Sequence, residues 1–241
     1  MIATAEIRGI NILLARNQTE FVDFLMSKGQ LKTGKLIAMN AEKLVMSEKD
    51  PEIRQLLTHT EYNYADGISI VRSVKRKYPH IKQMERIAGA DLWEALMQKA
   101  GELGIPVFLI GSTADTLAKV QQKLTAWRVN IVGSQDGYFD ESQQPLIIKR
   151  IKQSGAKFVT VAMGSPKQEK FIADVEREYP DCLYMGVGGT YDVFVGKVKR
   201  APKSWQNLGL EWLYRLFSQP TRCRRQINLL RFLYYYCTKQ L

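Results

Sequence analysis

One pattern recurs along most of the chain and restricts what it can fold into. Between about residues 35 and 190, a short apolar run, a turn of small or polar residues and an amphipathic stretch follow one another repeatedly. The apolar runs are KLIAMN, YNYA, IPVFLIGS, VNIVGSQDGYF, AKFVTVAMG and CLYMGVGG. Strands and helices that alternate in this way predict an α/β fold with a doubly wound, mostly parallel sheet.

The predicted sheet also locates a binding crevice. Parallel strands all end at one edge of such a sheet, and ligands bind in the crevice along that edge. We therefore expect the residues that follow the apolar runs to converge there, although they are far apart in the sequence. These residues are Asn40, Asp66, Gly111, Gly133, Gly164 and Gly188.

Asp66 stands between the run YNYA and a basic, helix-like stretch. Its carboxylate could cap the helix that follows, which is a common role for an aspartate in this position. It could also act as a general base, although an aspartate with the usual pKa of ~3.9 is a weak base at neutral pH. The residues alone leave both roles open.

The segment GSPKQEKF, residues 164–171, predicts a turn that opens a helix. The backbone N–H groups at such a helix start can bind an anion, and Gln168 offers both a donor and an acceptor. The alternative is purely structural. In that case Ser165 caps the helix, Pro166 is its first residue and Glu169 complements the helix dipole.

Positive charge is concentrated at the C-terminal end. From Lys197 onwards there are ten Lys and Arg residues and one acid, Glu211, in a chain of net charge +11. The stretches SWQNLGLEWLYRLF and TRCRRQINLLRFLYYYCTKQL predict two amphipathic helices separated by Pro220. We expect a core domain over 1–195 and a basic helical appendage over 196–241, whose charge favours nucleic acid, membrane lipid or a diphosphate as partner.

Several classes of protein are disfavoured. Three dispersed cysteines and two histidines permit no zinc-type cluster, and they suit a reducing cytoplasm. The first twenty residues lack the apolar core behind a basic start that is typical of a signal peptide, and no apolar run reaches the ~20 residues of a spanning helix. The segment GVGGTYDVF has Tyr191 where a dinucleotide-binding fingerprint needs its third glycine, which disfavours an oxidoreductase. A nucleic-acid-binding protein is supported by the charge of the tail but lacks an RNP-type strand motif.

Seven motifs carry a family resemblance. They are NAEK, YADGIS, ERIAGADLWE, VGSQDGYF, VAMGSPKQE, GVGGTYDVFVGKVKRAPKSWQ and LGLEWLYRL. In this order, over about residues 5–235, the chain resembles the WecG/TagA/CpsF family of bacterial glycosyltransferases. Among its branches, the sequence is most similar to the one that transfers N-acetyl-D-mannosaminuronic acid (ManNAcA) in enterobacterial common antigen synthesis.

The resemblance implies a Rossmann-like core and an inverting hexosyltransferase. Since the sequence has no D-x-D pair of the kind that metal-dependent sugar transferases often use, we expect the transfer to need neither a metal ion nor a cofactor. Its donor would be UDP-ManNAcA and its acceptor GlcNAc-diphospho-undecaprenol, so that the reaction converts lipid I to lipid II in polysaccharide biosynthesis. The alternative donor is UDP-ManNAc with the same class of acceptor. The protein would be cytoplasmic and bound peripherally to the anionic inner face of the cytoplasmic membrane, with no nucleic-acid partner.

The resemblance also implies site residues. Asp66 matches the proposed base, and the matching pocket residues are Asn40, Arg86 and Gln168. The stretches that resemble the nucleotide site contain Gly111, Gly137, Tyr138, Gly188 and Asp192. The appendage arginines that match a site for the lipid diphosphate are Arg215, Arg222 and Arg225.

A uronate donor adds one negative charge that the site must meet. Lys43 lies three residues after Asn40, and Arg72 lies six residues after Asp66. Lys43 is better placed to bind the donor carboxylate, because the first turn of a helix faces the crevice. The guanidinium of Arg72 would be the better bidentate partner for a carboxylate. A solvated helix face is the alternative for both residues.

Overall fold

The structure is a computed structural model that describes residues 2–27, 29–207, 209, 211–218 and 223–241, with only the backbone at 207, 215–218 and 223–227. Its centre is an eight-stranded sheet in the order β1-β2-β6-β5-β10-β9-β7-β8. The strands are β1 (Thr4–Ile7), β2 (Ile10–Leu13), β5 (Gly34–Met39), β6 (Tyr62–Ala65), β7 (Pro106–Gly111), β8 (Asn130–Gln135), β9 (Phe158–Ala162) and β10 (Leu183–Gly186). All neighbours pair in parallel except β1 and β2, so the predicted α/β, doubly wound, mostly parallel sheet is confirmed.

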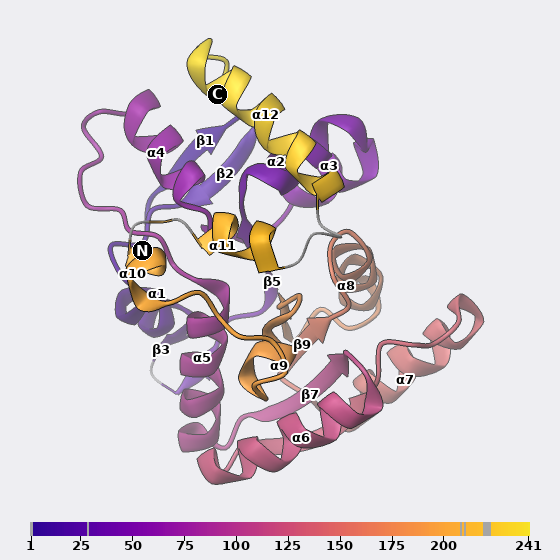
Figure 1. Cartoon of the computed structure of the whole chain (residues 1–241). Coiled ribbons are helices and arrows are strands. Elements are labelled where there is room, and N and C mark those ends of the chain that lie inside the picture. The colour runs from indigo at the N-terminus through magenta and orange to yellow at the C-terminus, as the bar shows by residue number, and fades with distance from the viewer. Residues whose placement is uncertain (1, 28, 208, 210, 219–222) are drawn as a thin grey trace.

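Helices cover both faces of the sheet (Figure 1). One face carries α2 (Ala41–Lys49), α3 (Pro51–Thr58), α4 (Ile68–Lys77), α7 (Gln144–Ser154) and α8 (Lys167–Glu178). The other carries α1 (Gln18–Leu25), α5 (Gly89–Leu103), α6 (Ala114–Leu124) and α9 (Thr190–Phe194). In the central strands, alternate residues enter the two layers, as Phe108 and Leu109 of β7 do, so these apolar runs become strands buried on both faces. The edge strands β1 and β8 are more exposed.

Shorter elements complete the core. A two-stranded sheet is formed by β3 (Met26–Ser27) and β4 (Gln30–Leu31). Two 3₁₀ turns, η1 (Thr125–Trp127) and η2 (Glu141–Gln143), precede β8 and α7. The β1–β2 hairpin turns at Arg8 and Gly9, both with positive φ, which is the geometry of a tight two-residue turn.

The direction of the chain reverses between β7 and β9. From β7 the chain passes through α6 to the edge strand β8, whereas from β9 it passes through α8 to β10 on the other side. Because α6 and α8 lie on opposite faces, the loops after β7 and β9 separate at this switch point, where α/β sheets bind ligands.

The basic tail forms three helices among the described residues, not the two that the sequence predicts. They are α10 (Lys203–Asn207), α11 (Glu211–Ser218) and α12 (Cys223–Cys237). Gly209, with φ +71°, lies between α10 and α11, where the sequence predicts one continuous helix. Phe232 and Tyr235 of α12 are buried against the core, and α12 packs on α2.

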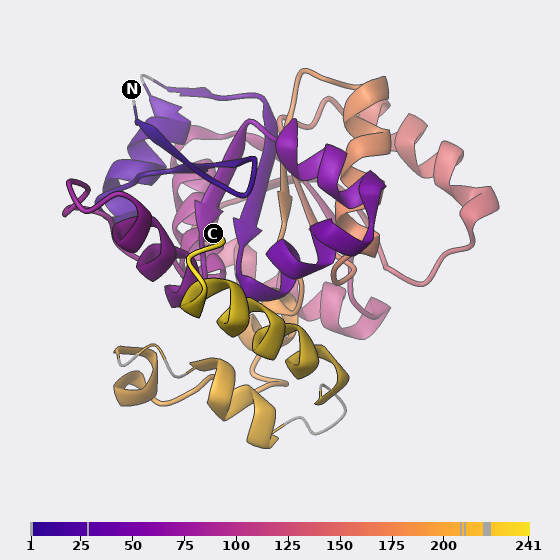
Figure 2. The same ribbon diagram turned by 90° about the horizontal axis from the view of Figure 1, so that it is seen from above.

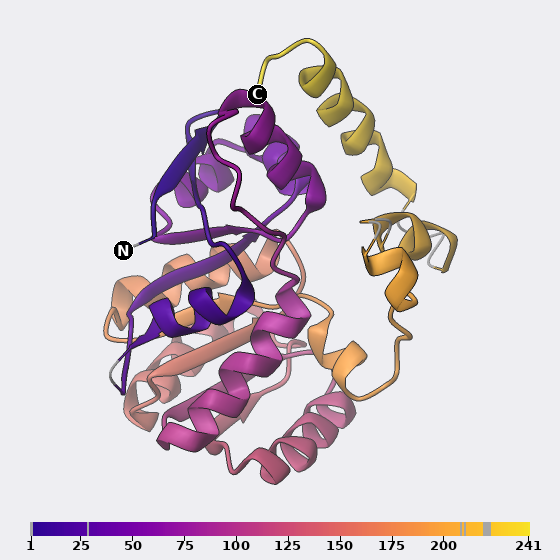
Figure 3. The same cartoon turned by 90° about the vertical axis from the view of Figure 1, so that its left-hand side faces the viewer.

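The three tail helices lie along the side of the core at which the parallel strands end (Figures 2 and 3). A Cβ atom on Gly209 would lie 3.0 Å from Ile68, the first residue of α4, so the tail approaches the chain two residues after Asp66. The division into a 1–195 domain and a 196–241 appendage stays a prediction.

Candidate active site

The register of the sheet brings two of the predicted residues together. Met39 pairs with Ala65, so the residues that follow them, Asn40 and Asp66, leave the sheet side by side. The backbone N–H of Asp66 donates to the Met39 carbonyl over 3.1 Å, which fixes the start of its loop. The expected convergence therefore holds for this pair, whereas Gly133 lies inside β8 under the Phe108 ring and not after the strand.

Asp66 does not cap the helix that follows it. Gly67 is the N-cap of α4 and makes no side-chain cap bond. Asp66 Oδ1 instead accepts a 2.9 Å hydrogen bond from the backbone N–H of Gly89, the first residue of α5. Within the described part of the chain, Oδ2 has no hydrogen-bond partner, so one carboxylate oxygen is anchored and the other remains able to accept a proton.

Tyr64 of β6 lies close to this loop, since a Cβ atom on Gly89 would be within 4 Å of both the Tyr64 hydroxyl and Asp66 Oδ1. Its hydroxyl is fully buried, has no hydrogen-bond partner among the described residues, and would lie 3.0 Å from a Cβ atom on Gly89. Burial, and then the charge of Asp66, raise the pKa of Tyr64 well above its usual range. The phenol therefore stays neutral. A side chain at position 89 would crowd the Tyr64 hydroxyl, which favours glycine there.

Arg86 reaches the same loop from the segment between α4 and α5. Its Nε donates to the Asp66 carbonyl over 2.6 Å, and one terminal nitrogen forms a 2.7 Å ion pair with Glu211 of α11. The segment itself is fixed on the sheet, because the N–H of Ile87 donates to the Ala65 carbonyl. Arg86 thus joins the Asp66 loop to the tail.

Asn40 is the N-cap of α2. Its Oδ1 accepts a 2.9 Å bond from the backbone N–H of Lys43, which turns its amide group to a fixed orientation. Its Cβ atom would lie 3.1 Å from a Cβ atom on Gly67, so it lies against the Asp66 loop. Among the described residues, the Asn40 Nδ2 has no partner and can still donate.

Gln168 is buried and its amide is held at both ends. Its Oε1 accepts from the backbone N–H of Gly188 over 2.9 Å, and its Nε2 donates to Glu169 over 2.9 Å. Glu169 is also buried and pairs with Lys43 over 2.8 Å. The structural expectation is wrong for the helix start, because Pro166 is the N-cap of α8 and Ser165 supplies no side-chain cap. Glu169 does lie in the first turn, where it complements the helix dipole, but it is also a buried ion-pair partner.

The two candidates for reading a donor carboxylate lie in different surroundings. The Lys43 ammonium is buried, pairs with Glu169 and donates to the Ala38 carbonyl over 2.9 Å, so Lys43 is not on a solvated face. Arg72 is exposed on α4 and has no ion-pair partner among the described residues.

The predicted nucleotide residues gather around the end of β7. A Cβ atom on Gly111, which has φ +111°, would lie 2.3 Å from the Ala162 carbonyl oxygen, so only glycine fits there. The N–H of Gly137 donates to the Ser112 carbonyl, and Asp192 accepts weakly from Ser112 Oγ at 3.3 Å. Gly111, Gly137 and Asp192 are therefore contiguous.

The other two predicted nucleotide residues differ in position, since Tyr138 directly follows Gly137 whereas Gly188 follows β10. Gly188 belongs to the Gln168 network, and Tyr138 is 79% exposed. A cavity of about 220 Å³ opens beside the β7 end, between α6 and β8, with Ala114, Ser134 and Asp136 among its lining residues.

Arg215, Arg222 and Arg225 lie outside the residues whose side chains are described. Residues that sequence reasoning missed are Ser112, Arg200 and Glu211. Glu211 carried a signal, because it is the lone acid in a basic tail. It is buried and lies within ion-pair distance of both Arg86 and Arg200.

Two further features bear on function. In the described segments, no three His, Cys, Asp or Glu residues lie close enough together to hold a metal ion. Of the helices in the described chain, none combines the length and the apolar character needed to cross a bilayer.

A comparison with family models identifies the chain. Residues 6–241 match the model described as glycosyl transferase WecG/TagA/CpsF family. The match includes both the sheet edge with Asp66 and the tail that covers it. The protein therefore belongs to the WecG/TagA/CpsF family of glycosyl transferases.

Proposed function

We propose that the protein transfers ManNAcA from UDP-ManNAcA to GlcNAc-diphospho-undecaprenol with inversion, which forms lipid II of enterobacterial common antigen. One observation carries the catalytic part of this proposal. Asp66 is half-buried at the carboxyl edge of the sheet, with one carboxylate oxygen bound to Gly89 and the other unpartnered among the described residues. Such a carboxylate has a fixed orientation and retains a site for a proton.

In the proposed reaction, Asp66 takes the proton from the acceptor hydroxyl of GlcNAc. The hydroxyl oxygen attacks the anomeric carbon of the donor sugar on the face opposite to the diphosphate. The new carbon–oxygen bond forms as the bond to the β-phosphate oxygen breaks, and UDP leaves with the electron pair. Asn40, whose Nδ2 remains available, would orient the sugars, and Gln168 would shape the pocket by holding the Gly188 backbone.

The nucleotide would lie along the loops at the switch point. Gly111, Gly137 and Asp192 are contiguous there, and Gly188 follows the adjacent strand β10. In a metal-independent transfer, charge on the departing UDP is met by arginine and backbone N–H groups. Arg86, tied to the Asp66 carbonyl, is one such arginine, and Arg215, Arg222 and Arg225 would meet the lipid diphosphate.

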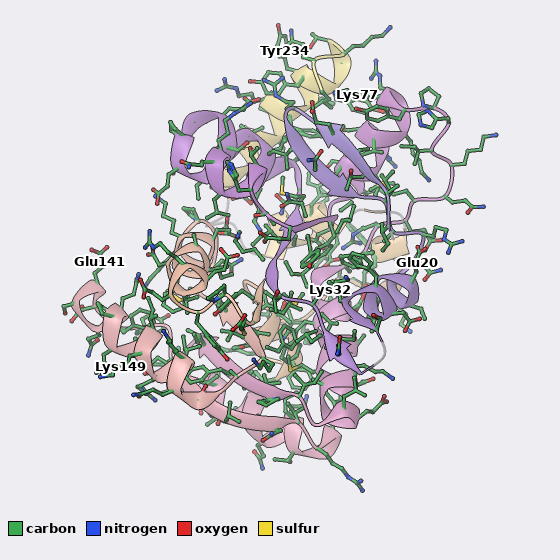
Figure 4. All side chains as sticks on the ribbon, turned by 180° about the vertical axis from the view of Figure 1, so that it is seen from behind. Glu20, Lys32, Lys77, Glu141, Lys149 and Tyr234 are labelled. Atoms are coloured by element: carbon green, nitrogen blue, oxygen red, sulfur yellow. The ribbon has the colours of Figure 1, made fainter. Side chains whose placement is uncertain are left out.

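We also propose that the tail binds the inner face of the cytoplasmic membrane as an appendage to the 1–195 domain. On α12, Phe232 and Tyr235 face the core, whereas Leu230, Leu233 and Tyr234 are 70%, 54% and 58% exposed. Figure 4 shows Tyr234 at the outer rim of the molecule. Apolar side chains beside basic residues are typical of helices that lie on anionic bilayers.

UDP-ManNAc is the second candidate donor, because neither candidate cation for a uronate carboxylate is free in the buried network. The Lys43 ammonium is already neutralised by Glu169, and Arg72 is exposed away from the buried network. For Lys43 to read a uronate, the donor carboxylate would have to share its ammonium with Glu169. An uncharged donor sugar requires no such rearrangement.

The test is product analysis by mass spectrometry with a short-chain GlcNAc-diphospho-lipid and either UDP-ManNAcA or UDP-ManNAc. A ManNAcA-GlcNAc product formed at the higher kcat/KM supports the proposal, and preference for UDP-ManNAc selects the second candidate. Lys43→Met and Arg72→Met should each be compared on both donors. A loss of about 10-fold or more in kcat/KM on UDP-ManNAcA alone would identify the residue that binds the donor carboxylate.

Metal dependence needs a separate test. Inhibition of the transfer by EDTA that Mg²⁺ reverses would overturn the metal-independent mechanism.

A further inference from the structure

Two guanidinium groups converge on one carboxylate at the edge of the candidate site. Arg86 contacts Glu211 Oε2 at 2.7 Å, and Arg200 Nε lies 3.8 Å from Glu211 Oε1. Each oxygen of the carboxylate therefore faces a different arginine. The Glu211 side chain is only 7% exposed, which removes most of the solvent screening between the three groups.

Both arginines are held in place independently of Glu211. Arg86 is anchored through its Nε to the Asp66 carbonyl. Arg200 is anchored through both terminal nitrogens to the Asp91 carboxylate in the first turn of α5. If Glu211 moved away, the two guanidinium groups would remain in position beside each other. Two pre-positioned arginines that share one anion form a typical phosphate site.

We propose that Arg86 and Arg200 form a diphosphate-binding subsite, which the Glu211 carboxylate occupies until a substrate displaces it. This inference rests on the proposed function, since it assigns the subsite to a substrate of that reaction. The diphosphate could be that of the nucleotide-sugar donor or that of the lipid acceptor, and both present the same oxygens to the arginines.

The consequence is a link between substrate binding and the tail. Glu211 is the first residue of α11, so its displacement by a diphosphate releases one of the contacts that hold α11 on the core. The bound tail thereby lowers the apparent affinity for the diphosphate, because the anion must compete with an internal carboxylate. Removing the charge of Glu211 should strengthen binding, whereas removing either arginine should weaken it.

The experiment is isothermal titration calorimetry of the full chain with inorganic pyrophosphate, UDP and geranyl diphosphate. Glu211→Gln should bind pyrophosphate at least 10-fold more tightly than the wild type. Arg86→Met and Arg200→Met should bind it at least 10-fold more weakly. Arg200→Met is a usable variant because its partner Asp91 is 44% exposed and can be solvated. Glu178→Gln, an exposed carboxylate at the end of α8, is the matched control and should behave as the wild type.

Pyrophosphate binding tests the subsite itself. If Glu211→Gln strengthens the binding of UDP more than that of geranyl diphosphate, the subsite binds the donor, and the opposite result assigns it to the lipid acceptor. Unchanged or weaker pyrophosphate binding by Glu211→Gln would show a fixed structural link and overturn the proposal. Unchanged binding by Arg200→Met would remove Arg200 from the subsite and overturn it as well. Because these titrations need no turnover, they are independent of whether the proposed transfer occurs.

A second measurement needs no variant. In hydrogen–deuterium exchange of the wild-type protein, pyrophosphate should speed exchange in the peptide that contains α11, since Glu211 is displaced. Slower or unchanged exchange there would contradict the displacement, even if a Glu211 variant failed to fold.

Discussion

The ammonium of Lys43 and the carboxylate of Glu169 form a 2.8 Å ion pair between the first turns of α2 and α8. The two helices follow β5 and β9, so the pair bridges the strand between them, β10. The side chains are 8% and 1% exposed. Through Gln168, the same network fixes the backbone of Gly188 at the crevice.

Breaking this pair on one side should be costly. Glu169→Gln leaves the Lys43 ammonium buried without a counter-charge, so we expect the free energy of unfolding to fall by about 3–5 kcal/mol. Urea denaturation at pH 7 measures the change. The double variant Lys43→Met/Glu169→Leu should regain most of the loss. Asp115→Asn, which breaks an exposed pair with Lys119, should cost less than about 1 kcal/mol, and an equally small effect of Glu169→Gln would contradict the prediction.

The same pair predicts a pH dependence of stability. Burial alone would raise the pKa of Glu169, but the Lys43 ammonium and the hydrogen bonds from Lys43 and Gln168 lower it overall. A folded-state pKa below the unfolded value of ~4.3 stabilises the fold above about that pH. This stabilisation is lost as the pH falls through the folded-state pKa. Urea denaturation from pH 6 to 3 should therefore show a steeper loss for the wild type than for Lys43→Met/Glu169→Leu, and parallel curves would refute the assignment.

Gly111 should tolerate no side chain. A Cβ atom there would lie 2.3 Å from the Ala162 carbonyl oxygen, and φ is +111°. Overpacking of ~1–3 kcal/mol and backbone strain of ~1–3 kcal/mol together predict a loss of about 3 kcal/mol or more for Gly111→Ala. Gly155→Ala is the control, since φ there is +67° but no atom lies within 4 Å of the added Cβ. It should cost only about 1–2 kcal/mol, and equal losses in thermal unfolding would show that strain alone decides.

Local patterns were enough to predict the six parallel strands from β5 to β10 and residues at their ends such as Asn40 and Asp66, but not the end of β8, inside which Gly133 lies. Strands buried on both faces are continuous apolar runs, and their carboxyl ends must share an edge, so the proximity of Asn40 and Asp66 followed from the fold class. The family motifs then singled out Arg86, which lies in an irregular segment that no periodicity marks.

Contacts between distant segments could not be predicted in this way. Asp66 was a candidate cap for α4, but its oxygen binds the start of α5, beyond an irregular segment of unpredictable path. Glu211 stood out only as the single acid of the tail. Its partners Arg86 and Arg200 depend on how the tail folds back, which side-chain periodicity does not specify.

The exposed apolar residues of α12 give a prediction about membrane binding. Leu230→Ser/Leu233→Ser should weaken binding to anionic vesicles by about 10- to 100-fold, because partial burial of each leucine contributes about 1 kcal/mol or more. Co-sedimentation with phosphatidylglycerol vesicles measures this. Leu146→Ser on α7 is the matched control, since Leu146 is 62% exposed and α7 lies far from the tail helices in Figure 1. Equal losses in both variants would mean that α12 is not the membrane contact.

Asp66→Asn separates the two roles of this residue. An asparagine keeps an oxygen that can accept from the Gly89 N–H, so α5 retains its hydrogen bond, but the amide cannot take a proton from the acceptor. We expect turnover of the glycosyl transfer to fall by roughly 10²–10⁴-fold with a change in unfolding free energy below about 1 kcal/mol. Asp115→Asn, at an exposed position on α6, should leave turnover unchanged and cost less than about 1 kcal/mol of unfolding free energy. If Asp66→Asn keeps activity within a few-fold while its melting temperature drops sharply, the carboxylate serves to hold α5 and the base lies elsewhere.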